Sequence, residues 1–512
     1  MINCPSCNSQ DIQKKGKDFR HGKISQRHRC KTCEINFYED DIVGMPLEYT
    51  KTALGTLPRN DDVNTFVVTA VVNNVPVNTK LFNTLLNYCK INNARLLIIP
   101  IKYDQDGSHE YLYDHYLKEY FIDENIKLCT GLKLMAGINI SPAIGNPLTS
   151  FENFSQGESL IIAHPQLALK SIAMSHVDPA TIMYTTSAIS ENIYTDTKQG
   201  TKASYNHSFG ALVVEEDFEI DGFHIRHLNS SDEGSFYDLD KFYDGELVLE
   251  DQTIEAIVLG DEHIIHADQD VTRAHFTNKD SIVNVLKPKF IVRHDSLDFY
   301  SGSHHHNRNI FTTYAKHQSG ANNVEAELDE TIAYVLNTTP EFAESIIISS
   351  NHNNHLLQWL QETNPKLDPT NALFYHEMMV MMLKKTKMEG SMATYPNPFK
   401  LWWESRYTHS NIKFVSEQSS FKIHGVELAF HSDKGTNGAR GSIVGFSKLG
   451  MRTIIGHSHS PGIFCGCYQT GTSSKLKLDY NTSASSWCHA DVLIHKNSKR
   501  QMIFIIKGKW RR

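Results

Sequence analysis

Between residues 65 and 101, continuous apolar runs flank a segment with helical spacing. The runs TFVVTAVV (65–72) and ARLLIIPI (94–101) have the character of buried strands. Between them, Leu81, Leu85 and Tyr88 recur at the spacing of one helical face. A strand, a helix and a second strand in this order predict a parallel sheet. The fold class that we expect is therefore α/β.

Further strand-like runs at 159–163, 181–186 and 211–215 continue the pattern. We therefore expect a Rossmann-like α/β domain at residues 63–245. No GxGxxG turn follows its first strand, so the pattern does not predict a dinucleotide site. The sequence indicates no task for this domain.

A second series of apolar runs begins near residue 255, and each run ends in polar residues that can bind metals. The runs are EAIVLGD, KFIVRHD, SIIISSNH, VELAFH and RTIIGHSH, and a helical face (Val324, Leu328, Ile332, Val335) separates two of them. In α/β enzymes the loops at the carboxyl ends of strands usually carry the chemistry. We expect a second α/β domain, an α/β sandwich, at residues 250–512.

The first residues contain two CxxC pairs that predict a zinc ribbon at residues 1–38, followed by a linker at 39–62. The four cysteines are Cys4, Cys7, Cys30 and Cys33. Four thiolates complete the tetrahedral coordination of zinc, so this zinc would be structural. Metal binding would supply the folding free energy that so small a module cannot obtain from its core.

The segment between the two CxxC pairs resembles the zinc ribbons of transposases and related DNA-handling proteins, which share the pattern CPxC…G…GxxxxRxxCxxC…F. By that resemblance the ribbon would bind DNA through Arg27, Arg29 and Lys31. The alternative is a ribbon that contacts another protein or mediates oligomerisation.

Composition and charge restrict the class of protein. The 512 residues are 40% hydrophobic and 21% charged, with a net charge of −8, which describes a soluble globular protein of two or three domains. Residues 1–33 hold eight Lys/Arg against two acids, and residues 496–512 hold seven and no acid. These basic ends suit docking to nucleic acid, and the alternative is a solvated surface.

Targeting and redox signals point to a cytoplasmic protein. No apolar stretch approaches the roughly 18 residues of a membrane span, and the polar first residues do not form a secretory signal. Beyond the two CxxC pairs, the remaining five of the nine cysteines are scattered. A disulfide framework is therefore not expected, and the chain suits a reducing compartment.

The metal-capable residues of the second domain form five motifs in order. They are Asp261-Glu-His263, His294-Asp295-Ser-Leu-Asp298, Ser350-Asn351-His352-Asn353, His431, and Gly456-His457-Ser-His459. Divalent ions of hard or borderline character bind carboxylate, imidazole and amide ligands. Two ions bridged by one carboxylate can stabilise both the attacking and the leaving oxygen of a phosphate ester. A histidine beside the ions can protonate the leaving group.

Together these motifs resemble the calcineurin-like metallophosphoesterase family, whose pattern is DxH, GDxxD, GNH(D/E), H and GHxH. The resemblance implies that Asp261, His263 and His459 bind a first metal, that Asp295 bridges, and that Asn351, His431 and His457 bind a second metal. His352 would be the general acid, and a metal-bridging hydroxide would attack phosphorus in line. The ions implied are manganese, with magnesium or iron as alternatives.

The sequence departs from that family pattern at four positions. His294 and Ser350 replace glycines, Asn353 replaces an acid, and Ser432 follows His431 in place of glycine. These changes put the surroundings of the metals in doubt, but every ligand-type residue is present.

His304, His305 and His306 lie in a polar loop that we expect to be solvated or to face the substrate, rather than to form a third metal site. Trp402 and Trp403 could stack on bases or could pack within the fold.

In its whole arrangement the chain resembles the early DNases of T5-like bacteriophages. We therefore expect a metal-dependent DNA nuclease with a two-metal mechanism, encoded by a phage and degrading host DNA in the host cytoplasm. Its expected partner is DNA. The protein could also form a homo-oligomer, and we expect no membrane association. The alternatives are a phosphatase of proteins or nucleotides that uses the same centre, and a DNA-binding scaffold with a vestigial metal site.

Overall fold

The chain divides into two compact units, Met1–Gly55 and Thr56–Arg512. The computed structural model describes residues 4, 7, 9–20, 23–38, 54–56, 63–103, 111–175, 180–306, 309–389, 396–408, 410–416 and 418–511. Most of the expected linker at 39–62 lies outside these residues. Among the described residues, no helix has both the length and the apolar character that crossing a membrane requires.

The first unit contains a small antiparallel sheet in the order β1-β2-β3. Its strands are β1 (Ile12–Arg20), β2 (Lys23–Cys30) and β3 (Asn36–Tyr38). Its core consists mainly of Cys4, Cys30 and Phe37, with His28 stacked on Phe37. So few buried side chains provide little hydrophobic stabilisation, which agrees with a module that depends on a metal.

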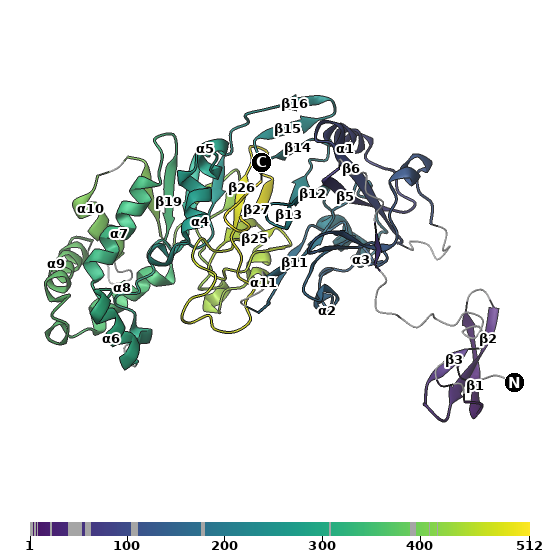
Figure 1. Cartoon of the computed structure of the whole chain (residues 1–512), viewed down its shortest axis with the longest axis horizontal. Coiled ribbons are helices and arrows are strands. Elements are labelled where there is room, and N and C mark those ends of the chain that lie inside the picture. Colours follow the sequence, from purple (N-terminus) through teal and green to yellow (C-terminus); the bar gives the residue numbers. More distant parts are fainter. Residues whose placement is uncertain are drawn as a thin grey trace. The chain divides into compact units, whose positions relative to one another are not determined.

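The second unit begins with the predicted strand–helix–strand segment (Figure 1). β5 (Thr65–Val72) and β6 (Ala94–Ile101) are parallel, and α1 (Thr79–Ile91) connects them. Asn78 caps α1 by accepting from the backbone N–H of Leu81, and the predicted apolar face of α1 is buried. β12 (Gly210–Asp217) and β13 (Gly222–Asn229) complete a sheet in the order β13-β12-β5-β6, in which the other pairs are antiparallel.

A larger mixed sheet combines strands from both of the expected domains. Its order runs β21-β22-β23-β25-β24-β10-β11-β9-β8-β7. Leu169 in β10 lies opposite Ile463 in β24, so residues 63–245 and 250–512 share this sheet and one compact unit. The strands are β7 (Asn125–Cys129), β8 (Leu132–Met135), β9 (Ser159–Ile162), β10 (Leu169–Ile172), β11 (Thr181–Thr185), β21 (Lys422–Ile423), β22 (Val426–Glu427), β23 (Arg452–Ile455), β24 (Gly462–Phe464) and β25 (Cys467–Gln469).

A six-stranded sheet in the order β20-β19-β18-β17-β26-β27 holds the first three metal-capable motifs. β17, β18, β19 and β20 are mutually parallel, so their carboxyl ends meet at one edge. Val258 and Val292 of this sheet share one core with Ile454 of the larger sheet, which places the two sheets face to face. The strands are β17 (Ala256–Val258), β18 (Phe290–Arg293), β19 (Glu344–Ile348), β20 (Ile412–Val415), β26 (Ala490–Ile494) and β27 (Arg500–Phe504).

Helices α7 to α10 lie together beside β19, in the green part of Figure 1. The predicted helical face of α7 is buried there, and so are Trp402 and Trp403 of α10. The guanidinium of Arg406 lies 3.3 Å from the ring centre of Trp402, so these aromatics pack within the fold. The helices of this part are α6 (Ile310–Ser319), α7 (Val324–Asn337), α8 (Asn351–Glu362), α9 (Ala372–Glu389) and α10 (Pro398–Arg406).

The remaining elements are short. They are β4 (Gly55–Thr56), η2 (His115–Tyr120), α2 (Glu152–Ser155), α3 (Lys198–Asn206), β14 (Phe236–Asp238), β15 (Lys241–Asp244), β16 (Leu247–Leu249), η3 (Ile264–His266), α4 (Gln269–Thr272), η4 (Arg273–Thr277), α5 (Ile282–Leu286), η5 (His304–His306), η6 (Pro365–Leu367), η7 (Thr436–Gly438) and α11 (Ile443–Ser447). The strands β14, β15 and β16 form a small antiparallel sheet of their own.

Candidate metal centre

The seven predicted metal-binding residues lie just beyond the carboxyl ends of strands in the two packed sheets. In chain order they are Asp261 and His263 after β17, Asp295 after β18, Asn351 at the start of α8 after β19, His431 after β22, and His457 and His459 after β23. The face-to-face packing of the sheets brings residues far apart in sequence into contact, because parallel strands present their carboxyl ends at one edge.

One group of ligand atoms consists of Asp261, His263 and His459, all of them buried. Nε2 of His263 lies 3.0 Å from Nε2 of His459. The same atom of His459 lies 3.1 Å from Oδ2 of Asp261. Ligand atoms that sit at right angles around an ion, each about 2.1 Å from it, are about 3.0 Å apart. The spacing of this group therefore fits one shared cation.

Asp295 lies between that group and the predicted second one. Its Oδ2 is 2.9 Å from Nε2 of His431 and 3.7 Å from Nε2 of His263. A carboxylate that touches a ligand of each group has the placement that a bridging ligand requires. The ring of His457 packs against the ring of His431, with 5.1 Å between their centres.

Several buried atoms of the centre have no hydrogen-bond partner within the described part of the chain. They include one carboxylate oxygen each of Asp261 and Asp295 (Oδ1 in both), the side-chain oxygen of Asn351 (Oδ1), and Nδ1 of His459. Leaving a buried polar atom without a partner costs about 1–3 kcal/mol. The two carboxylate oxygens of the centre, and the amide oxygen of Asn351 next to His352, match the ligand preference of a divalent cation. The donor set therefore fits the metals that the family resemblance implies.

The charges of the centre also favour cations. Burial alone would lower the pKa of His263, but its hydrogen bond to Asp298 and the charge of Asp295 outweigh burial and raise the pKa to about 9. Burial likewise opposes charge on His431, and Asp295 raises its pKa to about 9. Burial opposes the charge on Asp295, yet the neighbouring imidazoles hold its pKa well below the usual range. The carboxylates thus create a negative potential that positive charge stabilises.

Four of the seven predicted ligands have left-handed backbone conformations. The φ angles are 41° at His263, 46° at Asp295, 72° at His457 and 58° at His459. Residues other than glycine rarely adopt this conformation, which costs about 1–3 kcal/mol and persists where the surroundings enforce it. Such strained residues are concentrated at functional sites.

Gly456 leaves room for the first group of ligands. A Cβ atom at this position would lie 2.5 Å from Oδ1 of Asp261 and 3.0 Å from Cγ of His294. The next residue, His457, donates its backbone N–H to Oδ2 of Asp261 at 2.7 Å. Glycine at position 456 therefore allows the fifth motif to approach the first closely.

Buried groups beneath the predicted ligands hold the first two motifs together, and no local sequence pattern indicates them. The backbone N–H of His263 donates to the carbonyl of Asp295 at 2.8 Å. Glu262 accepts from the fully buried Arg293 and from Ser296, both at 2.6 Å. A charged pair enclosed in this way fixes the relative position of the two loops, and removal of one partner would leave the other charge buried and unpaired.

Two of the departures from the family pattern have a structural role. His294 is buried with Nδ1 3.4 Å from Nδ1 of His431, and the two rings stack. Asn353 accepts from the backbone N–H of Ser350 at 3.2 Å, which caps the first turn of α8. That cap fixes the residues between them, Asn351 and His352, at the helix N-terminus, where an anion is stabilised.

His352 is oriented by Asp298. Nδ1 of His352 makes a hydrogen bond to the backbone carbonyl of Asp298. A carbonyl only accepts, so Nδ1 carries the proton and Nε2 is the nitrogen that can take up or release one. Nε2 lies 4.0 Å from Oδ2 of Asp295, beside the predicted metal ligands. The predicted general acid therefore faces the centre with its reactive nitrogen.

The four cysteines of the first unit form a second candidate metal site. Cys4, Cys7, Cys30 and Cys33 come together, with 3.5 Å between the Sγ atoms of Cys4 and Cys33 and between those of Cys7 and Cys30. Thiolates around tetrahedral zinc at 2.3 Å are about 3.8 Å apart. The cluster is compatible with the predicted zinc ribbon.

Arg27, Arg29 and Lys31, the predicted DNA-binding residues, lie in or just after β2. Arg27 and Arg29 are two residues apart on the strand and therefore project from the same face. Arg29 pairs with Glu34 at 3.3 Å, and Lys31 pairs with Asp11 at 3.2 Å, in partly or fully exposed positions. Each exposed ion pair of this kind contributes only about 0–1 kcal/mol to stability. The basic side chain can therefore leave its acidic partner and bind another anion.

In the described part of the basic C-terminal segment, several Lys and Arg side chains contact acceptors of the second unit. Arg500 is buried and donates to the carbonyl of Gly466, and Lys507 donates to the carbonyl of Ile220. Lys509 and Arg511 pair with acids of the β12–β13 hairpin, Glu219 and Asp217. Composition alone could not show this, because the acidic partners lie nearly 300 residues earlier in the sequence.

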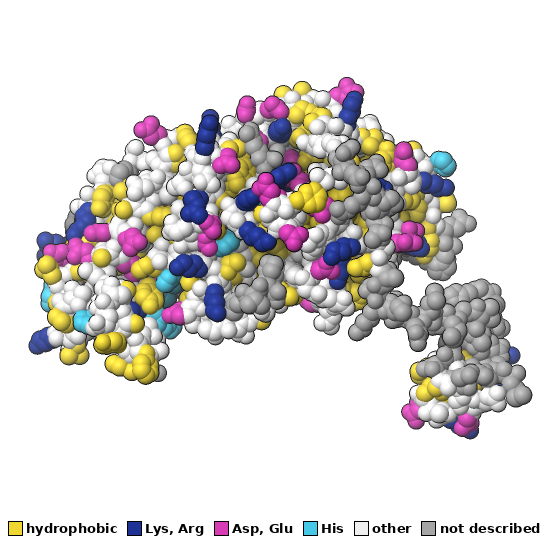
Figure 2. Space-filling view, viewed as in Figure 1, with side chains coloured by type: hydrophobic (Ala, Val, Ile, Leu, Met, Phe, Trp, Pro, Cys, Tyr) yellow, Lys and Arg dark blue, Asp and Glu magenta, His cyan; other side chains and the backbone are white. Residues whose placement is uncertain are grey.

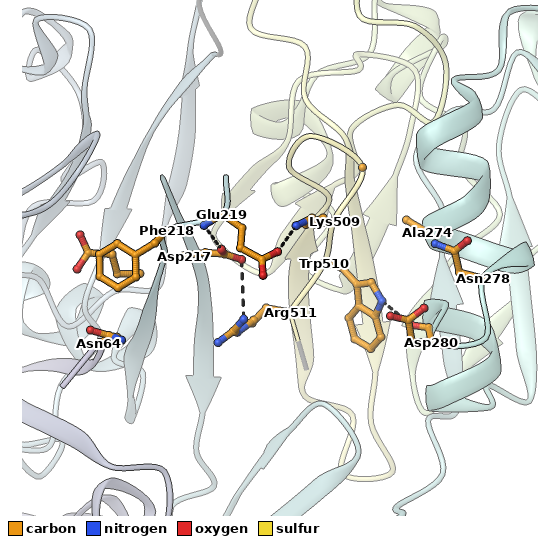
Figure 3. Close-up of a pocket in the computed structure, with 12 residues that line it drawn as sticks. Asn64, Asp217, Phe218, Glu219, Ala274, Asn278, Asp280, Lys509, Trp510 and Arg511 are labelled. Carbon is orange, nitrogen blue, oxygen red and sulfur yellow. Dashed lines mark hydrogen bonds and ion pairs between the residues drawn. The ribbon is translucent and has the colours of Figure 1, made fainter. Parts of the chain in front are cut away.

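Those C-terminal pairs line a cavity of about 510 Å³ that lies away from the predicted ligands (Figure 3). Trp510 donates from its indole nitrogen to the backbone carbonyl of Asp280 at 2.9 Å. The labelled charged residues Asp217, Glu219, Lys509 and Arg511 face one another as pairs. Cavity volume alone therefore does not single out a functional site.

No known family model matches the chain. Over most of its length it is similar to a phage protein. That relative is Protein A1 of Escherichia phage T5, which is 29% identical over 466 residues, covering 87% of this chain and 82% of the relative. The aligned length is too great to be confined to one motif.

Proposed function

We propose that the protein is a metal-dependent nuclease that hydrolyses phosphodiester bonds of DNA with two divalent cations. The observation that carries the proposal is the position of Asp295, between the Asp261–His263–His459 group and His431. That arrangement supports a dinuclear centre, and a dinuclear centre suits an in-line displacement at phosphorus.

The roles of the side chains follow from their positions. One ion would be held by Asp261, His263 and His459. The other would be held by Asn351, His431 and His457. Asp295 would bind both ions. Bound ions would supply Lewis-acid stabilisation of the attacking and leaving oxygens. His352 would bind the phosphate and deliver a proton from Nε2 to the leaving oxygen, because its Nδ1 proton is committed to the carbonyl of Asp298.

A cavity of about 300 Å³ adjoins the centre at His431 and offers room for part of a substrate. Phe430 and Phe446 provide apolar lining, and Lys434 and Gln418 provide polar lining. A nucleotide unit next to the scissile phosphate combines an apolar base face with polar edges and an anionic backbone, which suits this mixture.

DNA is the proposed substrate because the N-terminal ribbon resembles those of DNA-handling proteins. The similarity to a phage protein over most of the chain supports a phage origin. Figure 2 shows acidic and basic side chains interspersed over the face drawn, so any contact with nucleic acid would be local. By this proposal the protein is phage-encoded and degrades host DNA.

The proposal is tested by incubating the purified full chain with plasmid and linear DNA in manganese, in magnesium or in a chelator. Asp295→Ala and Asn351→Ala serve as matched variants, with Asp270→Asn on the exposed surface as the control. We expect cleavage in manganese, none with chelator, and loss of cleavage in the two centre variants alone. DNA that stays intact while small phosphomonoesters are hydrolysed would instead identify a phosphatase.

A further inference from the structure

A second cluster of histidines lies beside the metal centre, outside the seven predicted ligands. His304 and His305 come from η5, and His355 comes from α8, one turn after His352. One ring nitrogen from each of the three lies within 4.8 Å of the others. The ring centres of His304 and His355 are 5.1 Å apart, and those of His305 and His355 are 5.8 Å apart.

The loop that carries His304 and His305 is held in place by buried contacts. Glu327 of α7 accepts from the backbone N–H groups of Tyr300 and Ser301 at 2.8 and 2.7 Å. At the other end of η5, Nε2 of His306 lies 3.3 Å from a carboxylate oxygen of Asp479. The histidines are thus presented by an anchored turn next to a helix.

We propose that His304, His305 and His355 form a third metal site, separate from the dinuclear centre and selective for a zinc-like transition ion. The ligand set contains imidazoles only, and imidazole suits zinc, copper, iron and nickel, whereas magnesium and calcium prefer oxygen. Nitrogen ligands about 2.0–2.1 Å from tetrahedral zinc are about 3.3 Å apart, so small rotations of these side chains close the site.

The proposed third site is more exposed to solvent than the neighbouring centre. His305 is exposed, and His304 and His355 are half-buried, so the site opens to solvent and leaves coordination positions for water. Figure 2 shows histidine side chains at the surface beside the α6–α8 part. His355 contacts His352, with 5.0 Å between ring centres, so the third ion would lie next to the proposed general acid.

The signal for this site is absent from the local sequence. A row of three histidines in a polar loop indicates a solvated loop when it stands alone. The third ligand is supplied by α8, about 50 residues later, and His306, the last of the row, turns towards Asp479 instead.

The test is the zinc content of the full chain after chelator treatment and reloading, measured by mass spectrometry. The variants are the His304→Gln/His305→Gln double substitution and His355→Gln, and the matched control is His317→Gln, an exposed histidine on α6. We expect each cluster variant to bind one zinc fewer per chain than the wild type and the control. Equal zinc content in all four proteins would overturn the proposal.

Anomalous diffraction at the zinc edge from wild-type crystals decides the question even if a variant folds poorly. A peak among the three imidazoles, in addition to peaks at the cysteines and at the dinuclear centre, supports the site. Peaks at those other places without one at the three histidines overturn it. Neither measurement uses nuclease activity, so failure of the proposed function leaves the result interpretable.

Discussion

Oδ1 of Asp298 lies 2.7 Å from Nδ1 of His263, so this carboxylate orients a predicted metal ligand. Burial opposes charge on Asp298, but its hydrogen bond to His263 lowers its pKa to about 2. A carboxylate on the far nitrogen of a ligating histidine fixes the tautomer and raises the basicity of the nitrogen that faces the metal. Through its backbone carbonyl the same residue orients His352. Asp298 thereby positions both a ligand and the proposed acid.

Asp298→Asn should weaken manganese binding by about 10–100-fold, because removal of the partner of a ligating histidine has effects of that size. The backbone carbonyl remains, so the orientation of His352 should be preserved. Calorimetric titration of manganese measures the effect, with Asp270→Asn as the surface control. Unchanged manganese affinity in Asp298→Asn would contradict the positioning role.

His352→Ala should keep its metals and lose about 10²–10⁴-fold in kcat on DNA, the usual contribution of a general acid. The loss should be much smaller on bis(p-nitrophenyl) phosphate, because p-nitrophenolate leaves without needing a proton. Metal content and kcat on both substrates are the measurements. An equal loss of kcat on both would mean that His352 acts in another way, and loss of metal would make it a ligand.

Cys30→Ser should weaken DNA binding and unfold the ribbon, because Cys30 is fully buried among the four thiolates. Cleavage of a small phosphodiester should be unaffected, since the ribbon belongs to a separate compact unit. Binding to labelled DNA and hydrolysis of the small substrate are compared, with Cys465→Ser as the control. Parallel loss of both activities would show that the ribbon is part of the catalytic body.

Glu327 should make stability depend on pH. Burial raises its pKa from 4.5 to about 7, so the folded state favours the neutral acid. The resulting stabilisation is complete below about pH 4.5 and is lost as the pH rises through about 7, a change on the order of 3 kcal/mol.

The wild-type protein and Glu327→Gln should therefore differ in how their stability depends on pH. The free energy of unfolding of the wild type, minus that of the variant, should decrease as the pH is raised from 4.5 to 7.5. The amide does not titrate, so its effect on the hydrogen bonds of Tyr300 and Ser301 is the same at every pH. Denaturant titrations at a series of pH values provide the measurement. A difference that stays constant with pH would show that Glu327 is ionised in the folded protein throughout.

The sequence predicted that the side chains of the candidate site come together, but it did not predict the arrangement of the sheets that hold them. Asp261, Asp295 and Asn351 each follow an apolar run, and parallel strands bring such positions to one edge whatever the loops do. The pairing of β10 with β24 joins residues nearly 300 positions apart, and no local pattern records it. For that reason the expected division near residue 250 does not separate two compact units.

The contacts that surround the candidate site could be predicted from the sequence only where the two interacting residues are close together in the chain. Ser350 and Asn353 lie within one helical turn, and their cap follows a known spacing. Asp298 and His263 are 35 residues apart, and the hydrogen bond between them depends on how the loops after β17 and β18 meet. The pairing of Lys509 with Glu219 likewise needed the fold, since composition counts charges without locating their partners.

The proposed function requires Asp295 to lie between two cations. Anomalous diffraction at the manganese edge, from crystals of the full chain grown with manganese, shows where the ions bind. We expect two anomalous peaks about 3.5–4 Å apart, one beside Asp261, His263 and His459 and one beside Asn351, His431 and His457, with Asp295 touching both. A single peak, or two peaks that do not share Asp295, would contradict it.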